Sequence, residues 1–241
     1  MNKAVAMIAR KGRFSLKKVI NKITRAAGDA AAFIECRLCS STAGHFKTIK
    51  VKKYYSCPVC GAVMLASDNF ISAEDEKKRY MAHNNDVDDP GYRKFVGPVV
   101  ASVKAGFGME HKGLDFGAGP GPVIAKLLKD DGYDIRLYDP FFHNDPAALE
   151  SAYDYIVCCE VMEHFARPAE EFGRLRRLLK KNGKLFCMTC IYHSGIDFDN
   201  WHYKNDTTHT FFYSLETLEW IRMKYGFISM RVEYRLIEFS A

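Results

Sequence analysis

The chain has 241 residues, which is enough for one catalytic domain and a small additional module. Apolar residues make up 48% and charged residues 27% of it, as in an ordinary globular protein, and no apolar stretch approaches the roughly 18–20 residues that cross a membrane. The first residues also lack the pattern of a secretory signal, so we expect a soluble cytoplasmic protein.

The net charge of +6 is concentrated at the N-terminus. Residues 1–28 contain eight Lys and Arg and no acid, so residues 29–241 sum to −2. Apolar residues at helical spacing predict a basic helical segment over residues 1–30. Such a segment can bind RNA, an anionic membrane surface or a partner subunit. Its composition is also that of an organellar transit peptide or of a solvated terminal helix.

Four cysteines form two CxxC pairs within residues 31–70, which are predicted to be a zinc-ribbon-like module. Pairs at this separation suit one structural Zn²⁺ held by four thiolates, those of Cys36, Cys39, Cys57 and Cys60. The alternative of buried or disulfide-bonded cysteines is disfavoured in a cytoplasmic chain. Residues 45–56 alternate as in a strand or hairpin. A module this small is expected to be a binding module or a structural brace.

Residues 71–241 alternate between helix and strand patterns. Helices are expected over residues 74–83, 92–104, 122–129, 168–181 and 215–224. Strands are expected over residues 112–117, 134–140, 154–161, 183–192 and 231–240. This alternation predicts an α/β fold with a doubly wound, mostly parallel, Rossmann-like sheet. Two of the strands contain the remaining cysteines, Cys158, Cys159, Cys187 and Cys190, which we expect to be packing residues of the core.

A glycine run, GLDFGAGPGP at residues 113–122, follows the first of these strands and opens the next helix. Glycine permits φ > 0 and close approach to the backbone, and a doubly wound fold holds nucleotide-like ligands at this place. Asp139 ends the next strand, where a carboxylate can accept hydrogen bonds from a ribose. The chain has no Walker lysine–serine pair, which disfavours a nucleoside triphosphate.

Together, LDFGAGPG, LYDP and DYIVCCEVMEHF resemble the class I S-adenosylmethionine-dependent methyltransferase family over residues 71–241. The resemblance implies that S-adenosylmethionine is the cofactor. It implies that the glycine run lines the methionine part, through Asp115, Gly117, Gly119 and Gly121. It likewise implies that Asp139 holds the ribose hydroxyls and that Glu160 faces the pocket.

The helix that carries RYMAHNND resembles the N-terminal lid of such enzymes. Tyr80, His83 and Asn84 are therefore further cofactor-binding candidates, although each can equally be a surface or capping residue. The chain departs from the family twice. Only fourteen residues separate Asp139 from Asp154, where a helix and a third strand usually fit, so the group that reads the adenine edge is unassigned. The C-terminal residues 226–241 have no turn signal, so one edge strand is expected to be reduced or missing.

In-line methyl transfer needs an acceptor aligned beyond the carboxyl ends of the strands. Two segments reach that place: EVMEHF, with Glu163 and His164, and the long connection from residue 193 to 209. The candidates for catalysis are His164, His193 and His209, because imidazole can take a proton near neutral pH. The candidates for substrate binding are Trp201, Tyr203 and Asp206. The alternatives are that the connection is a structural cover over the sheet edge and that His164 only organises the site.

We expect a small-molecule acceptor such as a sugar, a lipid precursor or a secondary metabolite, partly because the cysteine-rich module resembles that of sugar C-methyltransferases. The alternative is an RNA or protein methyltransferase, since a ribosomal-RNA guanine methyltransferase family has a similar arrangement of ribbon and basic segment. The near-neutral charge of residues 29–241 disfavours this alternative. A non-catalytic protein that keeps the cofactor pocket ranks third. The sequence identifies neither the acceptor atom nor the oligomeric state.

Overall fold

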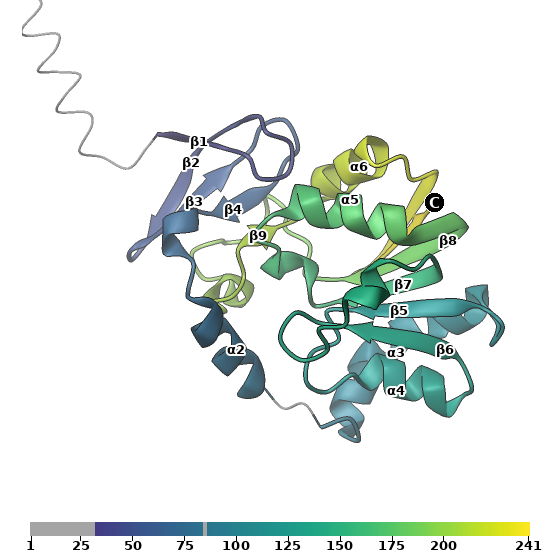
Figure 1. Ribbon diagram of the computed structural model, residues 1–241. Helices are drawn as coiled ribbons and strands as arrows, with labels where there is room; N and C mark the ends of the chain where they lie inside the picture. The colour runs from purple at the N-terminus through teal and green to yellow at the C-terminus, as the bar shows by residue number, and fades with distance from the viewer. Residues whose placement is uncertain (1–31, 84–85) are drawn as a thin grey trace, which may run out of the picture.

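The computed structural model describes residues 32–83 and 86–241, in which a small antiparallel ribbon joins a larger α/β sheet (Figure 1). The basic segment of residues 1–30, with the RNA and other partners predicted for it, lies outside the described residues.

The larger sheet has six strands in the order β10-β11-β8-β7-β5-β6. Their bounds are Lys112–Phe116 for β5, Asp134–Tyr138 for β6, Tyr153–Cys159 for β7, Leu179–Met188 for β8, Ser229–Glu233 for β10 and Leu236–Ser240 for β11. The four strands β6, β5, β7 and β8 run parallel, and β11 pairs antiparallel with both β8 and β10. The predicted α/β fold with a mostly parallel sheet is confirmed.

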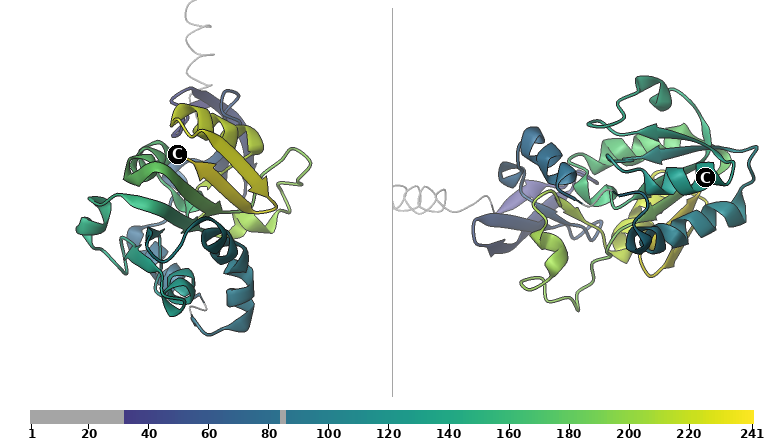
Figure 2. Two further views of the ribbon diagram at one scale, coloured as in Figure 1. Left: turned by 90° about the vertical axis from the view of Figure 1, so that its right-hand side faces the viewer. Right: turned by 90° about the horizontal axis from the view of Figure 1, so that it is seen from below.

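Helices cover both faces of this sheet (Figures 1 and 2). One face packs against α3 (Pro90–Gly106) and α4 (Val123–Asp130), and the other against α5 (Pro168–Leu178) and α6 (Leu215–Lys224). Successive residues of β7 divide between the two faces, because strand side chains alternate in direction. Tyr155 packs with the α3 and α4 side, whereas Ile156 and Cys158 pack with the α5 and α6 side.

The remaining cysteines pack in the sheet as expected. Cys158 and Cys187 are fully buried neighbours on adjacent strands, while Cys159 and Cys190 are partly buried. All four are free thiols.

The C-terminal strand prediction is wrong, because residues 231–240 belong to a hairpin rather than to one strand. Strands β10 and β11 pair through a turn at Tyr234 and Arg235. Tyr234 has φ of 56°, a left-handed conformation that turns usually assign to Gly, Asn or Asp. The sequence therefore carried no turn signal. The predicted helix 168–181 also ends early, at Leu178, because Leu179 is buried and pairs with Tyr153 in the sheet.

The segment between β6 and β7 is short, as the departure of the sequence from the family pattern predicted. Residues 139–152 hold only a single 3-10 turn, η3 (Pro146–Leu149), and an isolated bridge between Asp139 and His143. Within the described residues, β6 is consequently the edge strand on that side.

The ribbon is a second sheet, in the order β1-β2-β3-β4-β9. Its strands are β1 (Phe33–Glu35), β2 (Thr42–Ile49), β3 (Lys52–Ser56), β4 (Val63–Leu65) and β9 (Phe211–Phe212). The predicted hairpin is β2–β3, with Lys50 in a left-handed conformation at its turn. The fifth strand comes from the α/β part of the sequence, since Val63 pairs with Phe212 and Met64 with Phe211.

The ribbon therefore shares its interior with the α/β part (Figure 2). One hydrophobic cluster contains Cys36, Cys60 and Met64 of the ribbon together with Phe172 of α5 and Leu218 of α6. A second cluster is aromatic and joins Tyr54 of the ribbon to Phe198, Trp201 and Phe212. The domain boundary at residue 70 remains a prediction, and both clusters extend across it.

Phe212 offers a direct test of this shared core. The Phe212→Ala variant should lower the free energy of unfolding by about 3–5 kcal/mol, because it leaves a cavity beside Tyr54 and Trp201. Denaturant unfolding measures this. The matched control is Phe33→Ala on β1, whose side chain is 65% exposed and whose loss should cost less than about 0.5 kcal/mol. Equal effects of the two substitutions would contradict the shared core.

Candidate active site

A cavity of about 840 Å³ opens at the carboxyl ends of β5, β6 and β7. The glycine run forms one side of it, and the short turn η4 (Met162–His164) with His209 forms another. Helix α2 (Ala73–Met81) closes it through Glu76, Arg79 and Tyr80. Open α/β sheets bind ligands at this edge.

The glycine run needs glycine at two positions for different reasons. Gly117 has φ of 79°, and a Cβ there would meet the Val161 side chain at 2.5 Å. Gly119 has φ of 62°, but a Cβ there would meet no atom within 4 Å. Gly117 therefore allows the loop to pack against Val161. Gly119 and Gly121 both line the cavity, and the backbone at Gly119 is open to it.

Asp139 lines the same cavity and organises its backbone. One carboxylate oxygen accepts a hydrogen bond from the Gly119 N–H at 3.0 Å, and the other accepts from the Phe141 N–H at 2.8 Å. The oxygen bonded to Phe141 also accepts from the Phe142 N–H at 3.1 Å, so the oxygen bonded to Gly119 is the one that retains acceptor capacity, because a carboxylate can accept about four hydrogen bonds. Asp115 lies elsewhere: it is buried outside the cavity lining, with its carboxyl bonded to the Ala125 backbone, and burial raises its pKa to about 7.

Helix α2 starts as the sequence indicates, because the Ser72 hydroxyl caps it by accepting from the Asp75 N–H. Tyr80 and His83 both line the cavity. Tyr80 donates to Glu76 at 2.7 Å, and its ring packs edge-on against His164. Asn84, the third residue predicted on this segment, lies outside the described residues.

Glu160 turns into the cavity at the end of β7, where its φ of 52° breaks the strand. Arg235 donates to both of its carboxylate oxygens, at 2.7 and 2.6 Å. Burial and the nearby Glu163 carboxyl raise the pKa of Glu160, and Arg235 opposes them. Arg235 thus pairs with the partly buried Glu160 and acts on the buried Glu163 through its charge.

Glu163 is fully buried and is held by hydroxyl groups. Tyr203 donates to one of its oxygens, and Thr189 donates to the other at 3.1 Å. Burial raises the pKa of Glu163 to about 7. Tyr203 therefore contacts a lining residue, Glu163, but is not itself part of the cavity lining.

His164 and His209, two of the three histidines that line the cavity, have their ring centroids 4.8 Å apart. His209 Nδ1 lies 2.6 Å from the Tyr203 carbonyl, and His164 Nδ1 lies 3.2 Å from the Thr208 carbonyl. A carbonyl only accepts, so Nδ1 carries the proton in each ring and Nε2 is the nitrogen that can accept another.

Burial lowers the pKa of both rings, to about 3 for His209, where the adjacent His164 adds to the effect. Both are therefore neutral at physiological pH. The ligating atoms of Glu163, His164 and His209 lie within 4.8 Å of one another, a donor set and spacing that also suit a divalent cation.

The long connection contributes only part of what the sequence predicts. Asp206 and His209 line the cavity, and Asp206 pairs with Arg79 of α2 at 2.8 Å. Burial acts against the charge of Asp206, but hydrogen bonds from Arg79 and Thr208 hold its pKa well below its usual range.

Two other residues of this connection lie away from the cavity. His193 is exposed, and Trp201 packs with Tyr192 and Phe198 in the aromatic cluster. Trp201 is thus a packing residue, and it packs with the ribbon rather than over the sheet edge, where the alternative of a structural cover had placed the connection.

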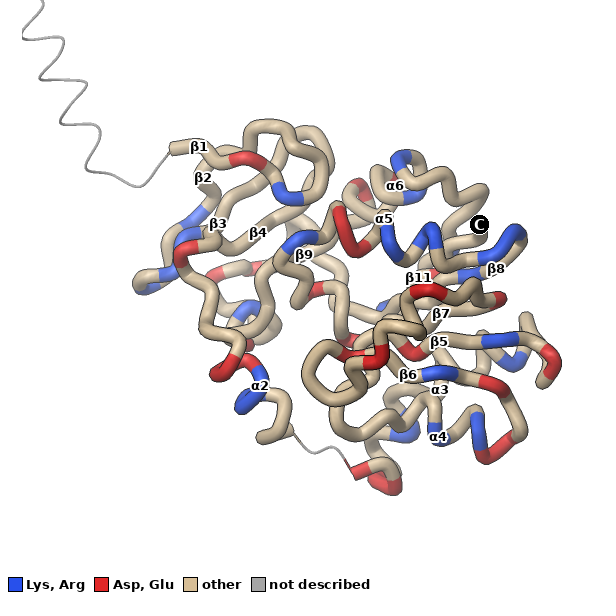
Figure 3. The backbone as a smooth tube through the Cα atoms, in the orientation of Figure 1, with Lys and Arg blue, Asp and Glu red and all other residues tan. Residues whose placement is uncertain are grey.

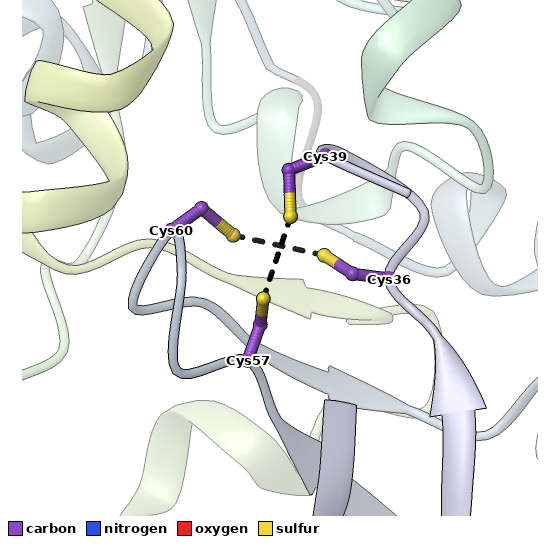
Figure 4. A group of neighbouring side chains, drawn as sticks. All are labelled: Cys36, Cys39, Cys57 and Cys60. Atoms are coloured by element: carbon purple, nitrogen blue, oxygen red, sulfur yellow. Dashed lines mark hydrogen bonds between the residues drawn. The ribbon is translucent and has the colours of Figure 1, made fainter. Parts of the chain in front are cut away.

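The four cysteines of the ribbon point their sulfurs toward one centre (Figure 4). Cys36 Sγ and Cys60 Sγ are 3.6 Å apart, and Cys39 Sγ and Cys57 Sγ are 3.4 Å apart. Four Zn–S bonds of about 2.3 Å in a tetrahedron need sulfur separations of about 3.7 Å. The cluster therefore fits a tetrahedral metal ion.

Residues 69–228 match a family model described as a methyltransferase domain. The chain belongs to the methyltransferase-domain family. The match covers the glycine run, Asp139, the segment with Glu160 to His164 and the connection with His209. It confirms the resemblance to the S-adenosylmethionine-dependent methyltransferases. Among the described residues, no helix is long and apolar enough to cross a membrane.

Two curated relatives are similar over 93 residues. They are the ubiquinone biosynthesis O-methyltransferases of Sodalis glossinidius, at 30% identity, and of Serratia proteamaculans, at 28%. The match covers 39% of this chain and 37% and 39% of theirs, so the chain spans well under half the length of these relatives.

Solved structures of methyltransferases are also similar at low identity. One is an O-methyltransferase family protein from Burkholderia thailandensis, at 16% identity and a TM-score of 0.48, over 68% of this chain and 61% of that one. Another is phosphoethanolamine N-methyltransferase 2 from Haemonchus contortus, in complex with S-adenosyl-L-methionine, at 18% identity and a TM-score of 0.49, over 71% and 48%.

Several residues at or near the cavity were not predicted from the sequence. Arg235 was hidden because its hairpin was predicted as one strand, and Arg79 because its partner Asp206 is 127 residues away. Phe141 lies two residues after Asp139 and lines the cavity. Its place just after the acidic end of a strand is a signal in the sequence that could have identified it.

Proposed function

We propose that this protein transfers a methyl group from S-adenosylmethionine to an oxygen atom of a small molecule. The observation that carries the proposal is one cavity with an open glycine backbone on one side and a neutral imidazole pair on the other. Family membership supports the reaction, and the names of the two curated relatives support an oxygen acceptor on a small molecule.

The residues on the glycine side fit the donor. The backbone at Gly119 and Gly121 gives close access, the Asp139 carboxylate retains acceptor capacity for a ribose, and Tyr80 with Phe141 gives aromatic walls. When bound, S-adenosylmethionine supplies a methyl group already activated on a sulfonium. The protein's task is then to hold the acceptor in line and to exclude water.

The residues on the other side fit an acceptor that must lose a proton. His209 is neutral, and its Nε2 can take the proton of a hydroxyl group as the oxygen attacks the methyl carbon. Asp206 and the Glu163 carboxyl lie beside the imidazolium that forms and stabilise its positive charge. His164 packs against His209 and orients it.

A small-molecule acceptor agrees with the charge and size of the site. Residues 29–241 sum to −2, and Lys and Arg are interspersed with Asp and Glu along the described chain (Figure 3). A polymer of nucleotides would favour a continuous basic face. The cavity volume lies within the range of about 300–1,000 Å³ of small-ligand sites.

We also propose that the ribbon cysteines hold one structural Zn²⁺. The sulfur geometry supports it, and these cysteines lie in the ribbon rather than in the cavity lining.

Donor binding can be tested on two residues of the cavity. Asp139→Ala removes the ribose acceptor and the support of the Gly119 N–H, and Gly119→Val places bulk at a left-handed position that faces the cavity. Each should weaken S-adenosylmethionine binding at least about tenfold, the effect of losing one or two hydrogen bonds to a charged group. Calorimetry measures the affinity. Unchanged affinity in both variants would contradict the assignment.

His209 and His193 form a matched pair for the acceptor side. Transfer of labelled methyl from S-adenosylmethionine into the small-molecule fraction of a cell extract should fall by about 10²–10⁴-fold in His209→Ala, with donor affinity retained. His193→Ala should leave transfer unchanged, because His193 is exposed and outside the cavity. Label that enters a nuclease-sensitive or protein fraction instead would favour the alternative acceptor classes, and equal effects of the two variants would defeat the role of His209.

Zinc can be tested independently of activity. Elemental analysis of the purified protein should give about one zinc per chain. Cys57→Ser should lose the metal and lower the melting temperature, because the cysteines belong to the shared core. Metal-free wild-type protein, or a Cys57→Ser variant with unchanged zinc and melting, would exclude the site.

A further inference from the structure

The ribbon contacts the acceptor side of the cavity through one side chain, Arg37, which lies between the first two cysteines. Its guanidinium donates to the Thr210 carbonyl at 2.6 Å, to the Leu65 carbonyl at 3.2 Å and to the Ala166 carbonyl at 3.2 Å. These carbonyls belong to three separate segments: the end of the long connection, the ribbon strand β4, and the link from η4 to α5.

Thr210 is where these segments meet. Its N–H donates to the Glu163 carbonyl at 2.9 Å, its hydroxyl donates to the Phe165 carbonyl at 3.2 Å, and its carbonyl also accepts from the Leu65 N–H at 2.9 Å. Thr210 directly follows His209 and directly precedes β9. The backbone on the carboxyl side of His209 is thus fixed to the ribbon and to η4 at once.

Arg37 suits this position for a physical reason. A guanidinium presents five N–H donors in a rigid plane, so one side chain can bond several carbonyls whose directions differ. Its plane also lies over the Phe70 ring at 4.7 Å. The cysteines on either side of Arg37 fix its backbone, since Cys36 and Cys39 belong to the four-sulfur cluster.

We infer that the zinc ribbon is part of the methyl-transfer site and that Arg37 is a positioning residue, through which the metal-held turn sets the place of His209. This inference rests on the proposed function, because it assigns to the ribbon the task of placing the proton acceptor of the reaction. It differs from the sequence-based expectation of a substrate-binding module or a passive brace.

The test compares Arg37→Met and Arg37→Lys with Lys47→Met in the full chain. Lys47 is the matched control, because it also joins the ribbon to the long connection, through an exposed ion pair with Asp199 at 2.6 Å that does not involve Thr210. Four properties are measured: zinc content, affinity for S-adenosylmethionine, transfer of labelled methyl to the small-molecule fraction of a cell extract, and the imidazole ¹⁵N–¹H NMR signals of His209.

Arg37→Met should retain zinc and bind the donor within about twofold of wild type, yet transfer methyl about 10–100-fold more slowly, as expected for a displaced catalytic group. Its His209 ring signals should shift. Arg37→Lys, which keeps the charge but bonds fewer carbonyls, should recover part of both properties. Lys47→Met should match wild type in all four.

Wild-type His209 signals and transfer in Arg37→Met would overturn the inference. If Arg37→Met does not fold, Arg37→Lys decides, and unchanged His209 signals in that variant overturn it equally. The two measurements separate the two proposals. If wild-type protein transfers no methyl group, the proposed function is wrong. The NMR comparison needs no turnover, so it still tests whether Arg37 positions His209.

Discussion

The antiparallel pairing of β4 with β9 joins the two halves of this protein. Strand β9 has only two residues, Phe211 and Phe212, and their side chains enter different hydrophobic clusters. Phe211 packs into the core beneath α5 and α6, and Phe212 packs into the aromatic cluster with Tyr54 and Trp201. A strand this short is not stable alone. It persists because burial on both sides and the β4 backbone hold it.

The position of β9 determines the cavity wall that contains His209. His209 precedes it by two residues, so the strand that completes the ribbon also fixes one end of the segment that lines the cavity. The other end is tied to α2 by the pair between Asp206 and Arg79. The chain turns between these two anchors and places His209 Nδ1 beside the carbonyl of Tyr203. The Tyr203 hydroxyl in turn donates to the Glu163 carboxylate. The ribbon, helix α2 and η4 are thus connected through one segment of five residues, 206–210.

Features encoded by local sequence were predictable. The glycine run, Asp139 and Glu160 follow strands whose apolar pattern is evident, and parallel strands bring their carboxyl ends to one edge. The CxxC spacing likewise predicted the sulfur cluster, because each pair is a local turn. Features that depend on contacts distant in sequence were not predictable. The turn at Tyr234 uses a residue without turn preference, and Trp201 resembles a binding residue until its aromatic neighbours from the ribbon are known.

Hydrogen exchange of the full chain, before and after a chelator withdraws the proposed zinc, tests most directly whether the ribbon holds the cavity wall that contains His209. Amides of residues 208–212 should lose protection together with those of β3 and β4, while the central strands β5, β7 and β8 stay protected, because the parallel sheet has its own core against α3 and α4. If residues 208–212 keep their protection while the ribbon opens, the ribbon is an independent module and the account is wrong.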